Sequence, residues 1–97
     1  MKVKDERVNP YINIGGAQIV AKDEILGIFD LDAASTKTDT KRFLSKCESE
    51  GHLVMVGNDI PKSFVLCTDS KRKEMVYMTQ LSTTSVEGRF KRKNAHL

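Results

Sequence analysis

Apolar residues in this chain occur in short runs that are separated by polar or glycine-containing turns. The runs are rich in Val, Ile, Phe and Tyr, which favour β-strands, and the first of them alternates at residues 11–14. The longest run, at residues 25–29, is much too short to span a membrane. Because 97 residues are enough for only one core, the pattern predicts a single small domain in which short strands predominate.

The order of these runs predicts a fold class. Strands are predicted at residues 11–14, 17–20, 25–31, 53–56, 63–68 and 74–79. Gly15-Gly16 predicts a two-residue hairpin turn between the first two strands, and Gly27 predicts a bulge or a close backbone approach in the third. Short turns after the first, fourth and fifth strands favour antiparallel pairing. The predicted fold is α+β, a mostly antiparallel sheet with one central helix and a short C-terminal helix.

Capping residues indicate where the two helices begin and end. After a predicted loop at residues 33–38, Asp39 or Thr40 can cap the central helix, and Gly51 is a good left-handed terminator. Ser82 opens the C-terminal helix, although without the glutamate of a full capping box. Both helices are short, so we expect them to depend on packing against the sheet.

Basic charge is concentrated at the two ends of the chain. The net charge of +3 is the sum of +1 over residues 1–9, −2 over residues 10–88 and +4 over residues 89–97. The predicted organisation is a basic N-terminal extension that could be disordered, one domain over 10–88 and a basic C-terminal tail over 89–97. A terminal basic run is either a solvated tail or an arm that binds nucleic acid.

No group of side chains predicts an active site. Cys47 and Cys67 are isolated and are typical of small buried side chains, and neither histidine has metal-ligand spacing to a cysteine. We therefore expect no enzymatic activity, no metal, no cofactor and no small-molecule ligand. The N-terminus has no apolar signal segment, which predicts a cytoplasmic protein without a membrane partner.

Several segments follow a familiar order. They are YINIGG at residues 11–16, IV at 19–20, ILGIFD at 25–30, KSFVL at 62–66 and YMTQLSTTSV at 77–86, with Arg89 beyond. Together they resemble the small bacterial extracellular matrix regulatory protein family, whose C-terminal signature is tyrosine–leucine–serine–proline–isoleucine–serine with a terminal arginine. Gln80 stands where the family has the proline. The paired glycine is closer to the B-type branch, and the resemblance covers residues 11–89.

This resemblance implies a role in the control of biofilm matrix genes in spore-forming bacteria. The A-type members are DNA-binding activators that assemble into rings. They use arginines at positions where this chain has Glu24 and Asp59-Ile60, so the local charge is reversed here. Lys22 and Lys62 lie close by in the sequence and could replace those arginines.

Two functional hypotheses follow. The first is a ring-forming homo-oligomer that binds double-stranded DNA through basic residues, with a steep dependence on salt. Its candidate contacts are Lys22, Lys62, Lys71, Arg72, Arg89 and Arg92. The second is an oligomeric adaptor that binds another protein and not DNA, which the slightly acidic body and the missing arginines favour.

Overall fold

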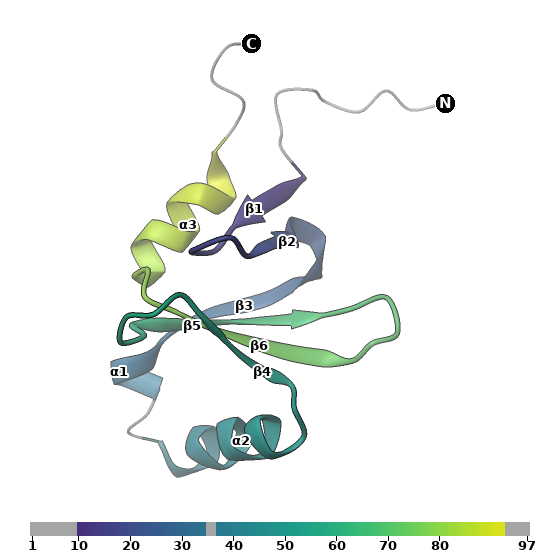
Figure 1. The fold of residues 1–97 in the computed structure, drawn as a ribbon, viewed down its shortest axis with the longest axis vertical. Coiled ribbons are helices and arrows are strands. Elements are labelled where there is room, and N and C mark those ends of the chain that lie inside the picture. Colours follow the sequence, from purple (N-terminus) through teal and green to yellow (C-terminus); the bar gives the residue numbers. More distant parts are fainter. Residues whose placement is uncertain (1–9, 35–36, 93–97) are drawn as a thin grey trace.

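A four-stranded mixed sheet forms the centre of the fold, in a computed structural model that describes residues 10–34 and 37–92 (Figure 1). Its strands lie in the order β3 (Ile25–Asp30), β5 (Ser63–Thr68), β6 (Glu74–Thr79) and β4 (Leu53–Val56). The β1 (Tyr11–Asn13) and β2 (Ile19–Ala21) strands form a separate hairpin, and a 3₁₀ turn, η1 (Lys22–Glu24), follows it. The predicted α+β class is confirmed. The predicted N-terminal extension lies outside the described residues.

The pairing of β4 differs from the prediction. β5 pairs antiparallel with both β3 and β6, so neither of its edges is left for β4. β4 pairs instead with the far edge of β6, in parallel, with Leu53 opposite Val76 and Val56 opposite Thr79. The tight turn at residues 69–73 joins β5 to β6 as a hairpin. Because β6 occupies this edge of β5, β4 does not pair with β5 although it precedes it in the sequence.

The turn of the β1–β2 hairpin is longer than predicted. Gly15 and Gly16 do have positive φ, at 127° and 50°. However, the backbone N–H of Ile14 donates to the carbonyl of Gln18 at 3.0 Å, which leaves a three-residue loop. The side chain of Asn13 organises this loop, because its Oδ1 accepts from the N–H of Gly15 at 2.8 Å and its Nδ2 donates to the carbonyl of Gly16 at 3.0 Å.

The predicted bulge in β3 is confirmed, but the end of this strand is not as predicted. The register against β5 shifts between Ile25 and Gly27. The strand ends at Asp30, and residues predicted as strand end and loop form a short helix, α1 (Leu31–Ala34). Asp30 Oδ1 accepts from the backbone N–H of Asp32 at 2.9 Å and of Ala33 at 3.2 Å. This side-chain cap stabilises a helical turn directly after the strand.

The two longer helices are α2 (Thr38–Ser49) and α3 (Thr83–Lys91). Lys37 occupies the N-cap position of α2, so the prediction of Asp39 or Thr40 as the cap is wrong. Asp39 lies in the first turn instead, where a carboxylate is favourable for the helix dipole. Gly51 ends the helix at φ 76°, and Ser82 caps α3 by accepting from the N–H of Ser85 at 3.1 Å, both as predicted. Residues 89–91 of the predicted tail belong to α3.

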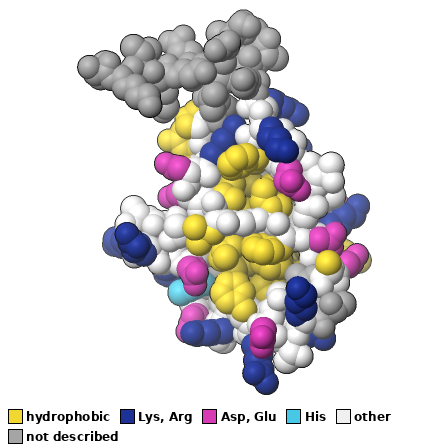
Figure 2. Space-filling view, turned by 180° about the vertical axis from the view of Figure 1, so that it is seen from behind, with side chains coloured by type: hydrophobic (Ala, Val, Ile, Leu, Met, Phe, Trp, Pro, Cys, Tyr) yellow, Lys and Arg dark blue, Asp and Glu magenta, His cyan; other side chains and the backbone are white. Residues whose placement is uncertain are grey.

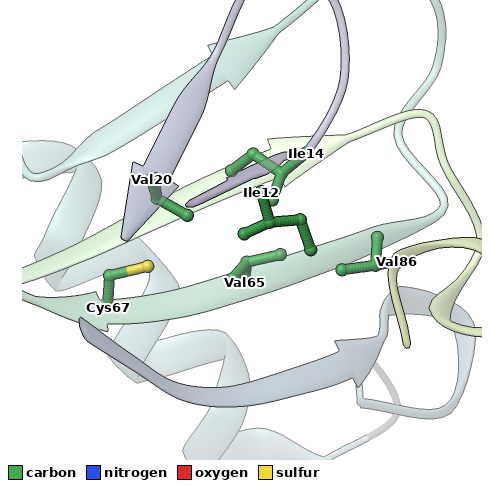
Figure 3. Close-up of a cluster of buried hydrophobic side chains, with 6 residues drawn as sticks. All are labelled: Ile12, Ile14, Val20, Val65, Cys67 and Val86. Carbon is green, nitrogen blue, oxygen red and sulfur yellow. The ribbon is translucent and has the colours of Figure 1, made fainter. Parts of the chain in front are cut away.

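Both faces of the sheet are covered by apolar side chains. The hairpin and α3 cover one face, where a first cluster of six buried residues forms (Figure 3): Ile12, Ile14, Val20, Val65, Cys67 and Val86. α2 covers the other face, where the buried residues are Cys47, Phe64, Val76 and Met78. We call the two sides the hairpin face and the α2 face. The alternation of side chains along β5 and β6 supplies both clusters.

Both cysteines are buried and free, as predicted. Burial raises the pKa of the Cys67 thiol from 9.0 to about 11 and also raises the pKa of Cys47, because an apolar setting disfavours the thiolate. Since the pKa of Cys67 is higher in the folded than in the unfolded chain, its contribution to stability is present below pH 9 and is lost as the pH rises toward 11.

We expect neither cysteine to react with Ellman's reagent in the native protein at pH 8 faster than the molecule unfolds. Both thiols should react at once in denaturant, which provides the reference rate. Rapid titration of one or two thiols in native buffer would contradict the burial of these side chains.

Ile14→Ala is expected to lower the free energy of unfolding by about 2–5 kcal/mol, because it opens a cavity in the hairpin-face cluster. The Ile14 side chain is 0% exposed, whereas Ile60 is 85% exposed and provides the matched control. Ile60→Ala should change stability by less than about 0.5 kcal/mol. Urea denaturation followed by circular dichroism measures both, and equal effects would contradict the assignment of Ile14 to the core.

Candidate nucleic-acid interface

The six predicted basic residues lie in three separate places. Lys22, Arg89 and Arg92 are at the C-terminal end of α3, Lys71 and Arg72 are in the β5–β6 turn, and Lys62 directly precedes β5. The turn projects from the sheet at the end opposite to the start of β5 (Figure 1). In Figure 2, Lys and Arg side chains are distributed around the margin of the molecule and do not form one patch. One protomer therefore does not present a continuous basic track on this face.

The first group joins the hairpin to the end of α3. The Nζ of Lys22 donates to the carbonyl of Arg92 at 3.3 Å and lies 5.6 Å from the centroid of the Phe90 ring. An ammonium group is favoured there, because the last carbonyls of a helix carry partial negative charge and the ring face attracts cations. Lys22 thus connects the 3₁₀ turn that follows the hairpin to the end of α3. Arg92 and the neighbouring Lys91 are exposed.

Arg89 makes contacts inside the protein. Its Nη1 donates to the backbone carbonyl of Asn13 at 3.2 Å and to Asn13 Oδ1 at 3.1 Å, and the side chain is half-buried. Asn13 also shapes the Gly15-Gly16 turn, so Arg89 connects α3 to the hairpin. Arg89 therefore positions α3 against the hairpin. The sequence resemblance had marked this arginine, but only the structure shows Asn13 as its partner.

The β5–β6 turn displays three consecutive bases in a defined loop. Asp69 Oδ1 accepts from the backbone N–H of Lys73 at 2.8 Å and of Lys71 at 2.9 Å, and Arg72 has a φ of 63°. These backbone hydrogen bonds, with that from Lys73 the stronger, hold the pKa of the Asp69 carboxyl below its usual value. The side chains of Lys71, Arg72 and Lys73 are all exposed. The carboxylate is thus used to hold the loop, which presents the bases to solvent.

Acidic residues lie near two of the candidate bases. Glu24 is half-buried at the end of the 3₁₀ turn that Lys22 begins, and Asp59 is exposed in the loop that leads to Lys62. Their negative potential reduces phosphate affinity at both places. The β5–β6 turn, where the carboxylate of Asp69 is hydrogen-bonded to the backbone, is therefore the strongest candidate contact.

Neither the comparison with protein-family models nor the comparison with curated proteins finds a match to this chain. Over residues 10–34 and 37–92, no helix has the length and apolar character needed to cross a membrane. The same described residues contain no group of three or more His, Cys, Asp or Glu side chains that could hold a metal ion.

Arg89→Ala is expected to lower the free energy of unfolding by about 1–2 kcal/mol, because it leaves Asn13 without its charged partner. Lys91→Ala, on the exposed side of the same helix, should cost less than about 0.5 kcal/mol. In a double-mutant cycle, Asn13→Ala should have a smaller effect in the Arg89→Ala background than in the original protein. Strictly additive effects in urea denaturation would show that the two side chains are not coupled.

Proposed function

We propose that the protein is a cytoplasmic regulator of extracellular matrix gene expression. In this proposal it forms a ring-shaped homo-oligomer and contacts double-stranded DNA through exposed bases. The resemblance over residues 11–89 supports the regulatory role. The observation that carries DNA binding is the β5–β6 turn, in which the carboxylate of Asp69 is hydrogen-bonded to the backbone while three consecutive bases face solvent.

Self-association is what makes this amount of charge sufficient. One turn can neutralise only a few phosphates, and each contact contributes a modest counterion-release term. Several copies of the turn in one assembly can contact the same duplex. Once one copy is bound, the others are held at a high effective concentration near the DNA, and the overall affinity is therefore much higher than that of one turn. Such a complex contacts the phosphate backbone, so it is tolerant of DNA sequence and sensitive to salt.

A protein-binding adaptor is the second candidate function. It is supported by the separation of the bases into three places and by the acids at Glu24 and Asp59. Large exposed hydrophobic side chains also favour it: Tyr11, Ile19, Leu26, Phe29, Met55, Ile60 and Phe90. Under this proposal the protein has no enzymatic activity.

The test for DNA binding is fluorescence anisotropy with a labelled duplex of about 60 base pairs at 50 and 200 mM salt. We expect the affinity to fall steeply with salt. In a plot of the logarithm of the binding constant against the logarithm of the salt concentration, each phosphate contacted contributes about −0.9 to the slope. A double charge reversal, Lys71→Glu with Arg72→Glu, should weaken binding and reduce this slope. The matched control is Lys41→Glu with Arg42→Glu, two exposed bases on α2 that undergo the same change in charge.

The outcomes separate the two functions. Loss of binding in the turn variant alone supports DNA contact through Lys71 and Arg72. Equal loss in both variants indicates that only net charge matters and contradicts an interface at the turn. The absence of any complex at micromolar protein in 50 mM salt would favour the adaptor.

A further inference from the structure

The central sheet has two unpaired edges. β3 and β4 are its outer strands, and within the described part of the chain no strand pairs with the outer side of either. β3 lies at the back of the molecule in Figure 1 and so faces the viewer in Figure 2, where hydrophobic side chains lie above and below a white band of backbone and other side-chain atoms. An exposed edge of this kind can accept a further strand.

Apolar grooves flank β3 on both faces of the sheet. On the hairpin face, a groove of about 290 Å³ is lined by Ile25, Leu26, Gly27, Ile28, Glu87, Phe90 and Lys91. On the α2 face, a groove of about 320 Å³ is lined by Phe29, Asp39, Thr40, Phe43, Phe64 and Leu66. Leu26 is 57% and Phe29 41% exposed, although both are large and apolar. A strand added to β3 places its side chains alternately on these two faces, so it must be apolar at successive positions.

β4 of the same sequence meets this requirement. Its four residues, Leu53, Val54, Met55 and Val56, are all apolar, and Met55 is 55% exposed. In its own protomer β4 cannot reach β3, because β5 and β6 lie between them. A second copy can present it.

The strand directions and faces of two copies agree when their sheets are joined. β3 and β6 both run opposite to β5, and β4 runs parallel to β6, so β3 and β4 have the same direction. A second copy can therefore be displaced sideways, across the strands, until its β3 lies beside β4 of the first copy. The two strands are then parallel, and the α2 faces of both sheets lie on the same side. Leu53 packs in the α2-face cluster, and Met55 lies on the same face of β4 by alternation. Met55 is thus directed to the groove beside Phe29 and Phe64 of the next copy.

We propose that β4 of one copy adds in parallel to β3 of a second copy, with Met55 in the α2-face groove. This inference rests on the self-association in the proposed function, and it names the surfaces that produce it. Because the two edges differ, the contact is head-to-tail and repeats from copy to copy, which leads to a closed ring or a filament. A two-fold β3–β3 pair, in contrast, would leave Met55 and both β4 edges uncovered.

The test is the molar mass of the full chain, measured by light scattering after size exclusion at about 100 µM. We expect a multiple of 10.9 kDa for the original protein and 10.9 kDa for both Met55→Asp and Leu26→Asp. Ile60→Asp is the matched control, an apolar-to-acid change at a residue that is 85% exposed and lies on neither edge, and it should keep the original mass. Circular dichroism and urea denaturation establish that each variant is folded.

Mixing the two edge variants gives the decisive result. Met55→Asp retains an intact β3 edge and Leu26→Asp an intact β4 edge, so an equimolar mixture should form a dimer of one copy of each. A two-fold pair through β3 would instead give dimers of Met55→Asp alone, and would overturn the proposal. The original oligomer mass in Met55→Asp, or no dimer in the mixture, would also overturn it.

In amide hydrogen exchange of the original protein, β3 and β4 should both be more protected at high than at low protein concentration. Unchanged exchange would contradict the proposal without the use of any variant.

The result also separates this inference from the proposed function. An original protein that is a 10.9 kDa monomer contradicts both the strand pairing and the oligomer of the proposed function. An oligomer that survives Met55→Asp and still binds DNA with a steep salt dependence contradicts the strand pairing alone.

Discussion

The structure depends on one strand, β5, which is paired along both edges and packed on both faces. Val65 and Cys67 lie in the hairpin-face cluster, while Phe64 lies in the α2-face cluster and Leu66 packs against it. Because β3 and β6 occupy both edges of β5, β4 must take the far side of β6. This arrangement determines where the two sheet edges lie and therefore which surfaces are open to a partner.

The same arrangement separates the basic residues. The β5–β6 turn is at one end of the sheet and Lys62 is at the other, separated by the length of β5. The end of α3 forms a third place, where Lys22 and Arg89 are used in contacts within the protein. In the proposed assembly, copies of the basic turn are repeated along one duplex, and this repetition links the binding proposal to the strand-pairing proposal.

How far the sequence predicts this fold depends on the range of the interactions involved. The bulge at Gly27, the helix end at Gly51 and the cap at Ser82 were predicted correctly, because each depends on nearby residues. The short helix α1 was missed because its residues were predicted as the end of the third strand and the start of a loop. For the candidate site, the sequence located the bases but gave no indication that Arg89 is bound to Asn13, 76 residues away.

The sequence alone determined the short strands, the two main helices and the concentration of charge at the ends, because residue spacing and local conformational preference are sufficient for these. The tertiary structure decided the parallel placement of β4, the role of Arg89 and the position of apolar grooves on both sides of β3. These features arise from contacts between segments far apart in the chain, where competition for strand edges and for buried volume selects one arrangement among several that local sequence permits.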